Sequence, residues 1–277
     1  MRNNQDRLGL GVPNENLNAS NEAPSSQSLE FIVPTEIVEL PSKGLFYGED
    51  HPLHHQETIE IKHMTTKEED ILTNESYIKD GSAIDRLLKS IIVDRRININ
   101  DILIGDKNAI TVAARMYGYG SDYQTKYTCP SCNTTQSVEF DLTEMENVDF
   151  EEGLNEFNAS LDHEKKLIYF KIPRTKTNLQ LRILNETTKQ DRKKKNKKGN
   201  LVSKFFEKII YSVNDNSDPG YVKSYITTMS ALDSRYLRAA YQKIVPNIDM
   251  SCEFECSNCG YEGKVEVPLK AEFFWPK

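Results

Sequence analysis

Two short Cys-x-x-Cys segments constrain this chain more than any other part of its sequence. The first, YTCPSCNTTQSVEFDL, covers residues 127–142, and the second, FECSNCGYEGKVEVPL, covers residues 254–269. Each has an aromatic residue two positions before its first cysteine and a Val-Glu-x-x-Leu segment after its second. Corresponding positions lie 127 residues apart. The same short sequence motif therefore occurs twice in one chain.

A tight Cys-x-x-Cys turn presents two sulfur atoms to one metal ion, and zinc prefers four such ligands in a tetrahedron. A site closed by four cysteines has no open position for water, so its role is structural and not catalytic. The two pairs predict one shared structural Zn²⁺ site with the ligands Cys129, Cys132, Cys256 and Cys259. Such a site would connect two parts of the chain that are distant in the sequence, and metal binding would contribute directly to the free energy of folding.

Two other interpretations of the cysteines stay open at this point. One is a degenerate ribbon that has lost its metal, and the other is a redox pair. Neither pair opens a helix after a strand, as thioredoxin-type chemistry requires. The fifth cysteine, Cys252, corresponds to Thr125 in the first segment. We interpret Cys252 as a small buried residue or an auxiliary thiol and not as a ligand.

The composition excludes several classes of protein. With 277 residues, 38% of them hydrophobic and 28% charged, the chain can form one large or two small domains. A net charge of −7 opposes a general affinity for nucleic acid, because Lys and Arg must displace counterions from phosphates. No run approaches the roughly 18 apolar residues of a membrane span. The first residues lack the apolar core of a secretory signal, which favours reduced thiols and a metal over disulfides.

The sequence predicts an α+β fold of two pseudo-repeated halves, each with helices and strands, joined by a zinc-ribbon-like element of four cysteines. Residues 1–28 are rich in Asn, Ser and Gln, and we expect a disordered arm there, either without a role or ordered on a partner. The first repeat covers 29–142, an acidic connection, expected as a loop or a helix, covers 143–165, and the second repeat covers 166–277. The unit exceeds 100 residues, so it is a repeat at the scale of a domain.

Both halves show the same order of expected elements: strand, Thr-capped helix, amphipathic helix, second helix, knuckle and strand. Thr65 and Glu68 have the spacing of a capping box. The amphipathic helix SAIDRLLKSIIVD, which Ser82 is expected to cap, matches SKFFEKIIYSV at residues 203–213. A further helix over 105–120, ended by its last two glycines, matches ALDSRYLRAAYQKI. Strands are expected at ETIEIKHM, KLIYFKIP and NLQLRIL.

One basic insertion interrupts the second half. Like charges at this density repel one another, so we expect an exposed and flexible segment at residues 189–198, either solvated or in contact with an acidic partner. Contact with nucleic acid lacks the support of interleaved aromatic residues. The basic residues are Lys189, Arg192, Lys193, Lys194, Lys195, Lys197 and Lys198.

No pattern of a catalytic site accompanies these features. The chain has no nucleophile elbow, P-loop or dinucleotide fingerprint. The histidines of HPLHH, at residues 51–55, lack a carboxylate-histidine pattern and are expected in a solvated loop. We therefore expect a protein that is not an enzyme.

Several segments in order resemble the baseplate hub proteins of T4-type contractile-tailed bacteriophages. These segments are ELPSKGLFYG, IEIKHMTTKEEDIL, GSAIDRLLKSIIVD, LIGDKNAITVAARMYGYGSDY and CPSC, within residues 38–142. The resemblance implies a structural phage tail component or a hub-assembly factor. The resemblance implies that the protein is made in the cytoplasm of the infected cell, that it acts in the virion tail baseplate, in the host cytoplasm during assembly, or in both, and that it binds other baseplate or hub proteins. The resemblance implies no catalytic residues.

The turn LPSKGLFYG is the best candidate for a contact with a partner, because it carries three consecutive large side chains beside Pro and Gly. The candidate residues are Leu40, Pro41, Lys43, Gly44, Leu45, Phe46 and Tyr47. In the alternative, the turn packs these side chains into its own core. A different function, a zinc-ribbon nucleic-acid-binding regulator, requires a basic face. The residues near the knuckles are instead acidic, namely Asp141, Glu144, Glu253, Glu255 and Glu262.

Overall fold

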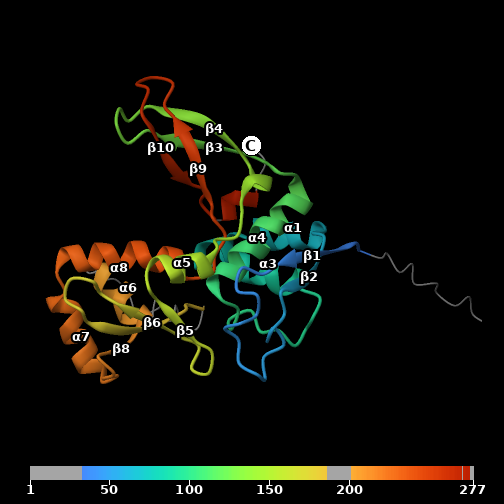
Figure 1. Ribbon diagram of the computed structural model, residues 1–277. Helices are drawn as coiled ribbons and strands as arrows, with labels where there is room; N and C mark the ends of the chain where they lie inside the picture. Colours follow the sequence, from blue (N-terminus) through green and yellow to red (C-terminus); the bar gives the residue numbers. More distant parts are fainter. Residues whose placement is uncertain (1–32, 186–200, 270, 275–277) are drawn as a thin grey trace, which may run out of the picture. The chain divides into compact units, whose positions relative to one another are not determined.

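The protein combines helices with small antiparallel sheets, which confirms the predicted α+β class (Figure 1). This computed structural model describes residues 33–185, 201–269 and 271–274. The expected arm at 1–28 and the basic insertion at 189–198 lie outside the described residues. Among the described helices, none is long and apolar enough to span a bilayer.

The first half begins with a two-stranded sheet that is followed by helices. The strands β1 (Thr35–Glu39) and β2 (Thr58–Lys62) pair antiparallel. The helices are α1 (Thr66–Thr73), α2 (Glu75–Asp80), α3 (Ala83–Ile91) and α4 (Ile104–Tyr119). The capping box at the start of α1 is confirmed, since Glu68 accepts a hydrogen bond of 3.0 Å from the backbone N–H of Thr65. Ser82 occupies the expected N-cap position of α3, but its side chain forms no capping hydrogen bond, because its hydroxyl instead accepts from the Arg86 side chain at 3.1 Å.

The acidic connection and the second half together contain a four-stranded antiparallel sheet in the order β5-β6-β7-β8. Its strands are β5 (Ser160–Asp162), β6 (Leu167–Lys171), β7 (Asn178–Arg182) and β8 (Ile210–Val213). The helices of these two segments are α5 (Phe150–Glu156), α6 (Leu201–Ile209), α7 (Pro219–Thr228) and α8 (Ala231–Ile244). The segment SKFFEKIIYSV, expected to be all helix, turns into strand β8 at Ile210. The reason is that Ile210 pairs with Leu181 of β7. The acidic connection 143–165 contains both α5 and β5.

Each half also carries one β-hairpin that follows its last long helix. The first hairpin comprises β3 (Asp122–Thr128) and β4 (Thr135–Asp141) and follows α4. The second comprises β9 (Ser251–Glu255) and β10 (Glu262–Glu266) and follows α8. Short 3₁₀ turns follow the hairpins at η2 (Leu142–Glu144) and η4 (Ala271–Phe274). Figure 1 shows the two hairpins side by side.

Two hydrophobic clusters form the core. One contains side chains of the second half between Ile168 and Ile244, on β6, β7, β8 and the helices α6, α7 and α8. The other contains side chains from Val38 to Phe150 together with residues from Ile248 to the end of η4. The end of the second predicted repeat therefore packs with the first. The division into 29–142, 143–165 and 166–277 stays a prediction.

A buried arginine joins helix α4 to the end of the described chain. The Arg115 guanidinium donates hydrogen bonds to the carbonyl oxygens of Phe273 at 3.1 Å, Gly120 at 2.6 Å and Asp122 at 3.1 Å. A buried cation must be compensated by acceptors of this kind. Arg115 thereby fixes the point at which the first hairpin leaves α4.

Candidate metal centre

The side chains of the four predicted cysteine ligands meet in space. The sulfur of Cys129 lies 3.8 Å from that of Cys259, and the sulfur of Cys132 lies 3.6 Å from that of Cys256. All four sulfurs lie within 4.8 Å of one another. Tetrahedral zinc with Zn–S bonds of about 2.3 Å sets its sulfurs about 3.8 Å apart. The donor set therefore fits a single tetrahedral metal ion.

The two cysteine turns have the same backbone structure. In the first turn, the N–H of Cys129 donates to the carbonyl of Thr134, and the N–H of Asn133 donates to the carbonyl of Cys129, both at 2.9 Å. The second turn repeats these two bonds, at the same distance, between Cys256, Tyr261 and Gly260. The backbone at Asn133 and Gly260 has positive φ, 57° and 67°, a region that Gly and Asn tolerate best.

The two turns also hold each other directly. The Gln136 side chain donates to the carbonyl of Glu255 at 2.9 Å and accepts from the backbone N–H of Ser257 at 3.0 Å. The Tyr127 ring packs edge to face on the Phe254 ring. The hairpins therefore have protein contacts that bring the four sulfurs together, and a metal ion would add to these contacts.

The surroundings of the sulfurs shift the pKa values of two of the four thiols in opposite directions. Hydrogen bonds from the Thr134 side chain and backbone lower the pKa of the Cys132 thiol to about 5. At Cys259 a backbone hydrogen bond with Tyr261 favours the thiolate. Desolvation and hydrogen bonds with the other sulfurs outweigh it and raise the pKa to about 11. A metal ion would have to displace the remaining thiol protons, because thiolates are its ligands.

The surface of the hairpins is acidic. Their strands expose the lysines Lys126 and Lys264, and they expose the carboxylates of Asp122, Glu139, Asp141, Glu253, Glu255, Glu262 and Glu266. Phosphate groups need the opposite sign of charge. These described strands therefore lack the basic face that a nucleic-acid-binding ribbon requires.

The fifth cysteine lies outside the cluster of sulfurs. Cys252 is half-buried and pairs with Val265 across the second hairpin, just as Thr125 pairs with Val138 across the first. Burial is the main cause that raises the pKa of the Cys252 thiol. This position suits the interpretation of Cys252 as a small packing residue.

The turn predicted as a partner contact directs its aromatic side chains inward. Leu40, Pro41, Gly44, Phe46 and Tyr47 are buried and Leu45 is half-buried. Lys43 is exposed and forms an ion pair of 2.9 Å with Glu151. The aromatic side chains are therefore not free to enter the pocket of a partner in this conformation. The turn instead packs these side chains into the core, as the alternative interpretation of this segment expected.

A buried carboxylate on helix α4 anchors this turn. Asp106 accepts hydrogen bonds from the backbone N–H of Ser42 at 2.9 Å, the Ser42 hydroxyl at 2.6 Å and the Tyr47 hydroxyl at 2.7 Å. The Tyr47 oxygen in turn accepts from the N–H of Leu103 at 3.1 Å. Burial raises the pKa of Asp106 despite these donors, which act in the opposite direction. Sequence reasoning missed this anchor, although an acidic residue in the first turn of a helix was a usable signal.

The histidines of the HPLHH segment pack beside Tyr47. The His51 ring stacks on the Tyr47 ring with centroids 4.4 Å apart, and the Nδ1 atom of His54 lies 2.9 Å from the Tyr47 carbonyl oxygen. These two histidines are partly buried, whereas His55 is exposed. Among the described residues, no histidine joins a group that could hold a metal ion.

The fold and the cysteine cluster define a class of α+β protein in which two β-hairpins share one metal-capable group of four sulfurs. A family described as T4 bacteriophage base plate protein matches residues 34–275, and the chain therefore belongs to this family. No curated protein and no solved structure matches it. The predicted resemblance is confirmed at the level of the phage baseplate. Membership implies a place in the virion tail and contacts with other tail proteins.

Proposed function

We propose that this chain is a non-enzymatic component of the baseplate hub, or a factor that assembles the hub, and that it acts through protein–protein contacts. The observation that carries this proposal is the family match, which extends over both cysteine pairs and both hydrophobic clusters. The acidic hairpin surface supports a protein partner over nucleic acid. The proposal assigns no residue a catalytic role.

The metal centre has a structural role in this proposal. Zinc bound by the four cysteines would connect hairpins that follow α4 and α8, far apart in the sequence. Because the unfolded chain holds no preformed site, the free energy of metal binding becomes free energy of folding. The ion would thus hold the surfaces that contact other tail proteins in a fixed arrangement.

A duplication explains why one site is assembled from two distant pairs. In each half, a central strand residue pairs antiparallel with one neighbour on either side. The two sets are Glu36–Ile61–Ile92 and Ile168–Leu181–Ile210. In each half, a helix then leads into a hairpin with a Cys-x-x-Cys turn. This common order supports two pseudo-repeated halves joined by a zinc-ribbon-like element.

Mass spectrometry of purified virions, beside that of tail assembly intermediates, tests the proposal. A hub subunit is expected in both samples, whereas an assembly factor is expected in the intermediates alone. A phage that lacks this chain should fail to assemble hubs. Normal tails in such a phage would contradict the proposal. Salt-sensitive binding of the purified chain to DNA would instead favour the nucleic-acid-binding regulator.

A further inference from the structure

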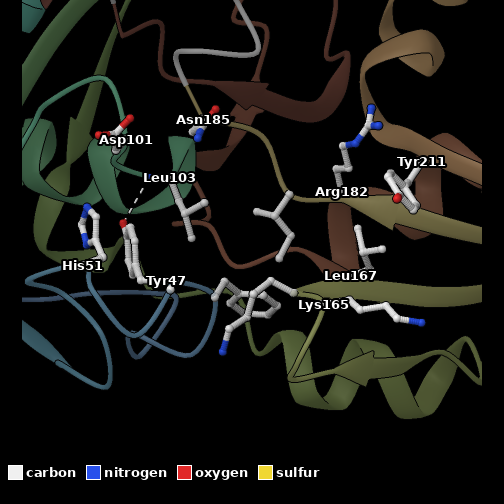
Figure 2. Close-up of a pocket in the computed structure, with 13 residues that line it drawn as sticks. Tyr47, His51, Asp101, Leu103, Lys165, Leu167, Arg182, Asn185 and Tyr211 are labelled. Carbon is white, nitrogen blue, oxygen red and sulfur yellow. Dashed lines mark hydrogen bonds between the residues drawn. The ribbon is translucent and has the colours of Figure 1, made fainter.

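A cavity of about 680 Å³ lies where the turn after β1 faces the four-stranded sheet. Figure 2 shows Tyr47 and His51 on one side of it and Arg182 and Tyr211 on the other. Leu103 lies between these two groups. Five separate segments of the chain contribute to the lining. A cavity of this size accommodates several side chains of a bound peptide.

Three apolar side chains that line the cavity are buried, those of Phe46, Leu103 and Leu167. Phe46 belongs to the turn after β1 and Leu103 directly precedes α4, whereas Leu167 of β6 lies on the other side, where it pairs with Arg182 of β7 (Figure 2). The hydroxyl of Tyr47 is fixed between Asp106 and the N–H of Leu103. The aromatic residues of the turn LPSKGLFYG, Phe46 and Tyr47, are therefore not exposed as anchors. They form part of the lining of the cavity instead.

Three cations line the cavity at and just before strands β6 and β7. The Arg182 guanidinium lies 4.8 Å above the Tyr211 ring, and it has no carboxylate partner among the described residues. The Lys165 ammonium reaches the Asp162 carboxylate only at 4.0 Å. Lys166 donates to the carbonyl of Leu45 at 3.0 Å, which leaves its positive charge in place.

A neutral donor at the other end of the cavity also lacks an acceptor. The Nδ1 atom of His51 lies 3.1 Å from the backbone N–H of Leu53 and accepts its hydrogen bond, so Nε2 carries the proton. This Nε2 atom is buried and has no partner among the described residues. Burial lowers the pKa of His51, and Asp101 opposes this shift more weakly. The lowered pKa keeps the ring neutral near pH 7. A buried N–H without an acceptor is costly in folding free energy.

The charges that line the cavity favour an anionic ligand. Among the described lining residues, Lys165, Lys166 and Arg182 oppose one carboxylate, Asp101, which accepts from the Asn98 side chain at 3.0 Å. Asp162 does not line the cavity, but its carboxylate lies 4.0 Å from the Lys165 ammonium. The cavity is therefore positive in a chain whose net charge is −7. Arginine binds carboxylates in a bidentate geometry, which adds orientation to the attraction.

We propose that this cavity is the docking site for an acidic segment of another tail protein. A carboxylate of the segment pairs with Arg182 and Lys165, and an adjacent apolar side chain packs against Phe46, Leu103 and Leu167. This inference rests on the proposed function, since it names the chemistry of one partner. It also gives the turn LPSKGLFYG a role in binding that does not require its side chains to be exposed.

Site-specific photo-crosslinking in infected cells tests this assignment. Gly48 lines the cavity, and a Cβ atom added there meets no atom within 4 Å, so Gly48→p-benzoylphenylalanine introduces the probe at the rim without a clash at its Cβ atom. Arg174→p-benzoylphenylalanine, in the exposed turn between β6 and β7, is the matched control position. Mass spectrometry then identifies each cross-linked segment.

We expect the probe at position 48 to capture a tail-protein segment that contains at least two Asp or Glu residues. Arg182→Glu and Lys165→Glu should each reduce this cross-link about tenfold, whereas Arg174→Glu should not change it. Lys165 is exposed, so Lys165→Glu stays informative if Arg182→Glu fails to fold, and thermal melting checks both variants.

Three results at position 48 would overturn the inference: no cross-link, a cross-link to a neutral or basic segment, or a cross-link within copies of this chain. If the chain still purifies with tail complexes, only the inference fails and the proposed function stands. If the chain is absent from tail complexes, the proposed function fails, and the inference fails with it.

Discussion

The rings of Tyr127 and Phe254 pack edge to face with their centroids 4.7 Å apart, although 127 positions separate them in the sequence. The same offset relates Cys129 to Cys256 and Cys132 to Cys259. Two sulfur contacts, of 3.8 and 3.6 Å, are crossed, from the first cysteine of one pair to the second cysteine of the other. Equivalent residues that meet each other, and crossed contacts between pairs, are what two copies related by a local two-fold produce. The cysteine centre lies on the contact between the proposed repeats.

The aromatic pair should stabilise this contact cooperatively. We expect the double variant Tyr127→Ala/Phe254→Ala to lose less unfolding free energy than the sum of the losses in the two single variants. The expected coupling energy is about 1 kcal/mol, typical of edge-to-face rings. Urea unfolding of the four proteins in the presence of zinc measures the coupling. Strictly additive losses would mean that the two rings touch without supporting each other.

The anchor of the turn should depend on the Tyr47 hydroxyl. Tyr47→Phe keeps the buried ring but removes a donor to Asp106 and the acceptor of the Leu103 N–H. We expect a loss of about 1–3 kcal/mol in the free energy of unfolding, because buried polar groups lose their partners. Tyr211→Phe is the control, since Tyr211 is partly exposed and the fold should tolerate the change. Equal melting temperatures for the two variants would contradict the assignment.

The buried Asp106 should give stability a specific pH dependence. Its pKa in the fold is raised above the ordinary value of 3.8, so over that range the folded protein binds more protons than the unfolded chain. Its contribution is therefore complete below the ordinary value and is lost as pH rises through the raised pKa. The unfolding free energy of the native protein minus that of Asp106→Asn should decrease from about pH 4 upward. This difference, measured by urea unfolding at successive pH values, cancels metal-linked changes common to both proteins. A difference that is flat or that grows with pH would contradict the raised pKa.

A close backbone contact joins the start of α4 to the segment after α8. A Cβ atom on Gly105 would lie 2.0 Å from the carbonyl oxygen of Pro246, so one of the two segments must shift. We expect Gly105→Ala to destabilise the protein by about 1–3 kcal/mol, as other forms of overpacking do. At Gly48 an added Cβ meets no atom within 4 Å, so Gly48→Ala should leave the melting temperature unchanged. If both variants melt like the native protein, these segments do not approach each other this closely.

Local patterns in the sequence predicted the local elements well. The capping box of Thr65 and Glu68, the buried face of α3 and the end of α4 at Gly120 depend on neighbours within a few residues. Strand β8 escaped prediction because Ile210 follows an amphipathic helix directly. Its strand conformation comes from pairing with Leu181, far back in the chain, and a local pattern does not contain that information.

The cysteine cluster and the cavity also differ in how far the sequence predicts them. The spacing of the cysteines predicted the cluster of sulfurs, because each Cys-x-x-Cys turn is itself a local motif and its repetition suggested a shared ion. The cavity between Tyr47 and Arg182 was not predictable, since its five segments have no common motif and meet only in the folded chain. Equally, the burial of Phe46 depends on contacts such as that with the Phe150 ring, 5.5 Å away between centroids.

We propose that the two cysteine pairs bind one structural metal ion between them. Elemental analysis of the purified chain, by mass spectrometry of its metals, tests it most directly. We expect about one zinc per chain in the native protein and in Cys252→Ser. We expect none in Cys129→Ser/Cys256→Ser, together with a large fall in melting temperature. No bound metal in the native chain, or zinc retained in Cys129→Ser/Cys256→Ser, would show that the four cysteines do not form a structural metal site.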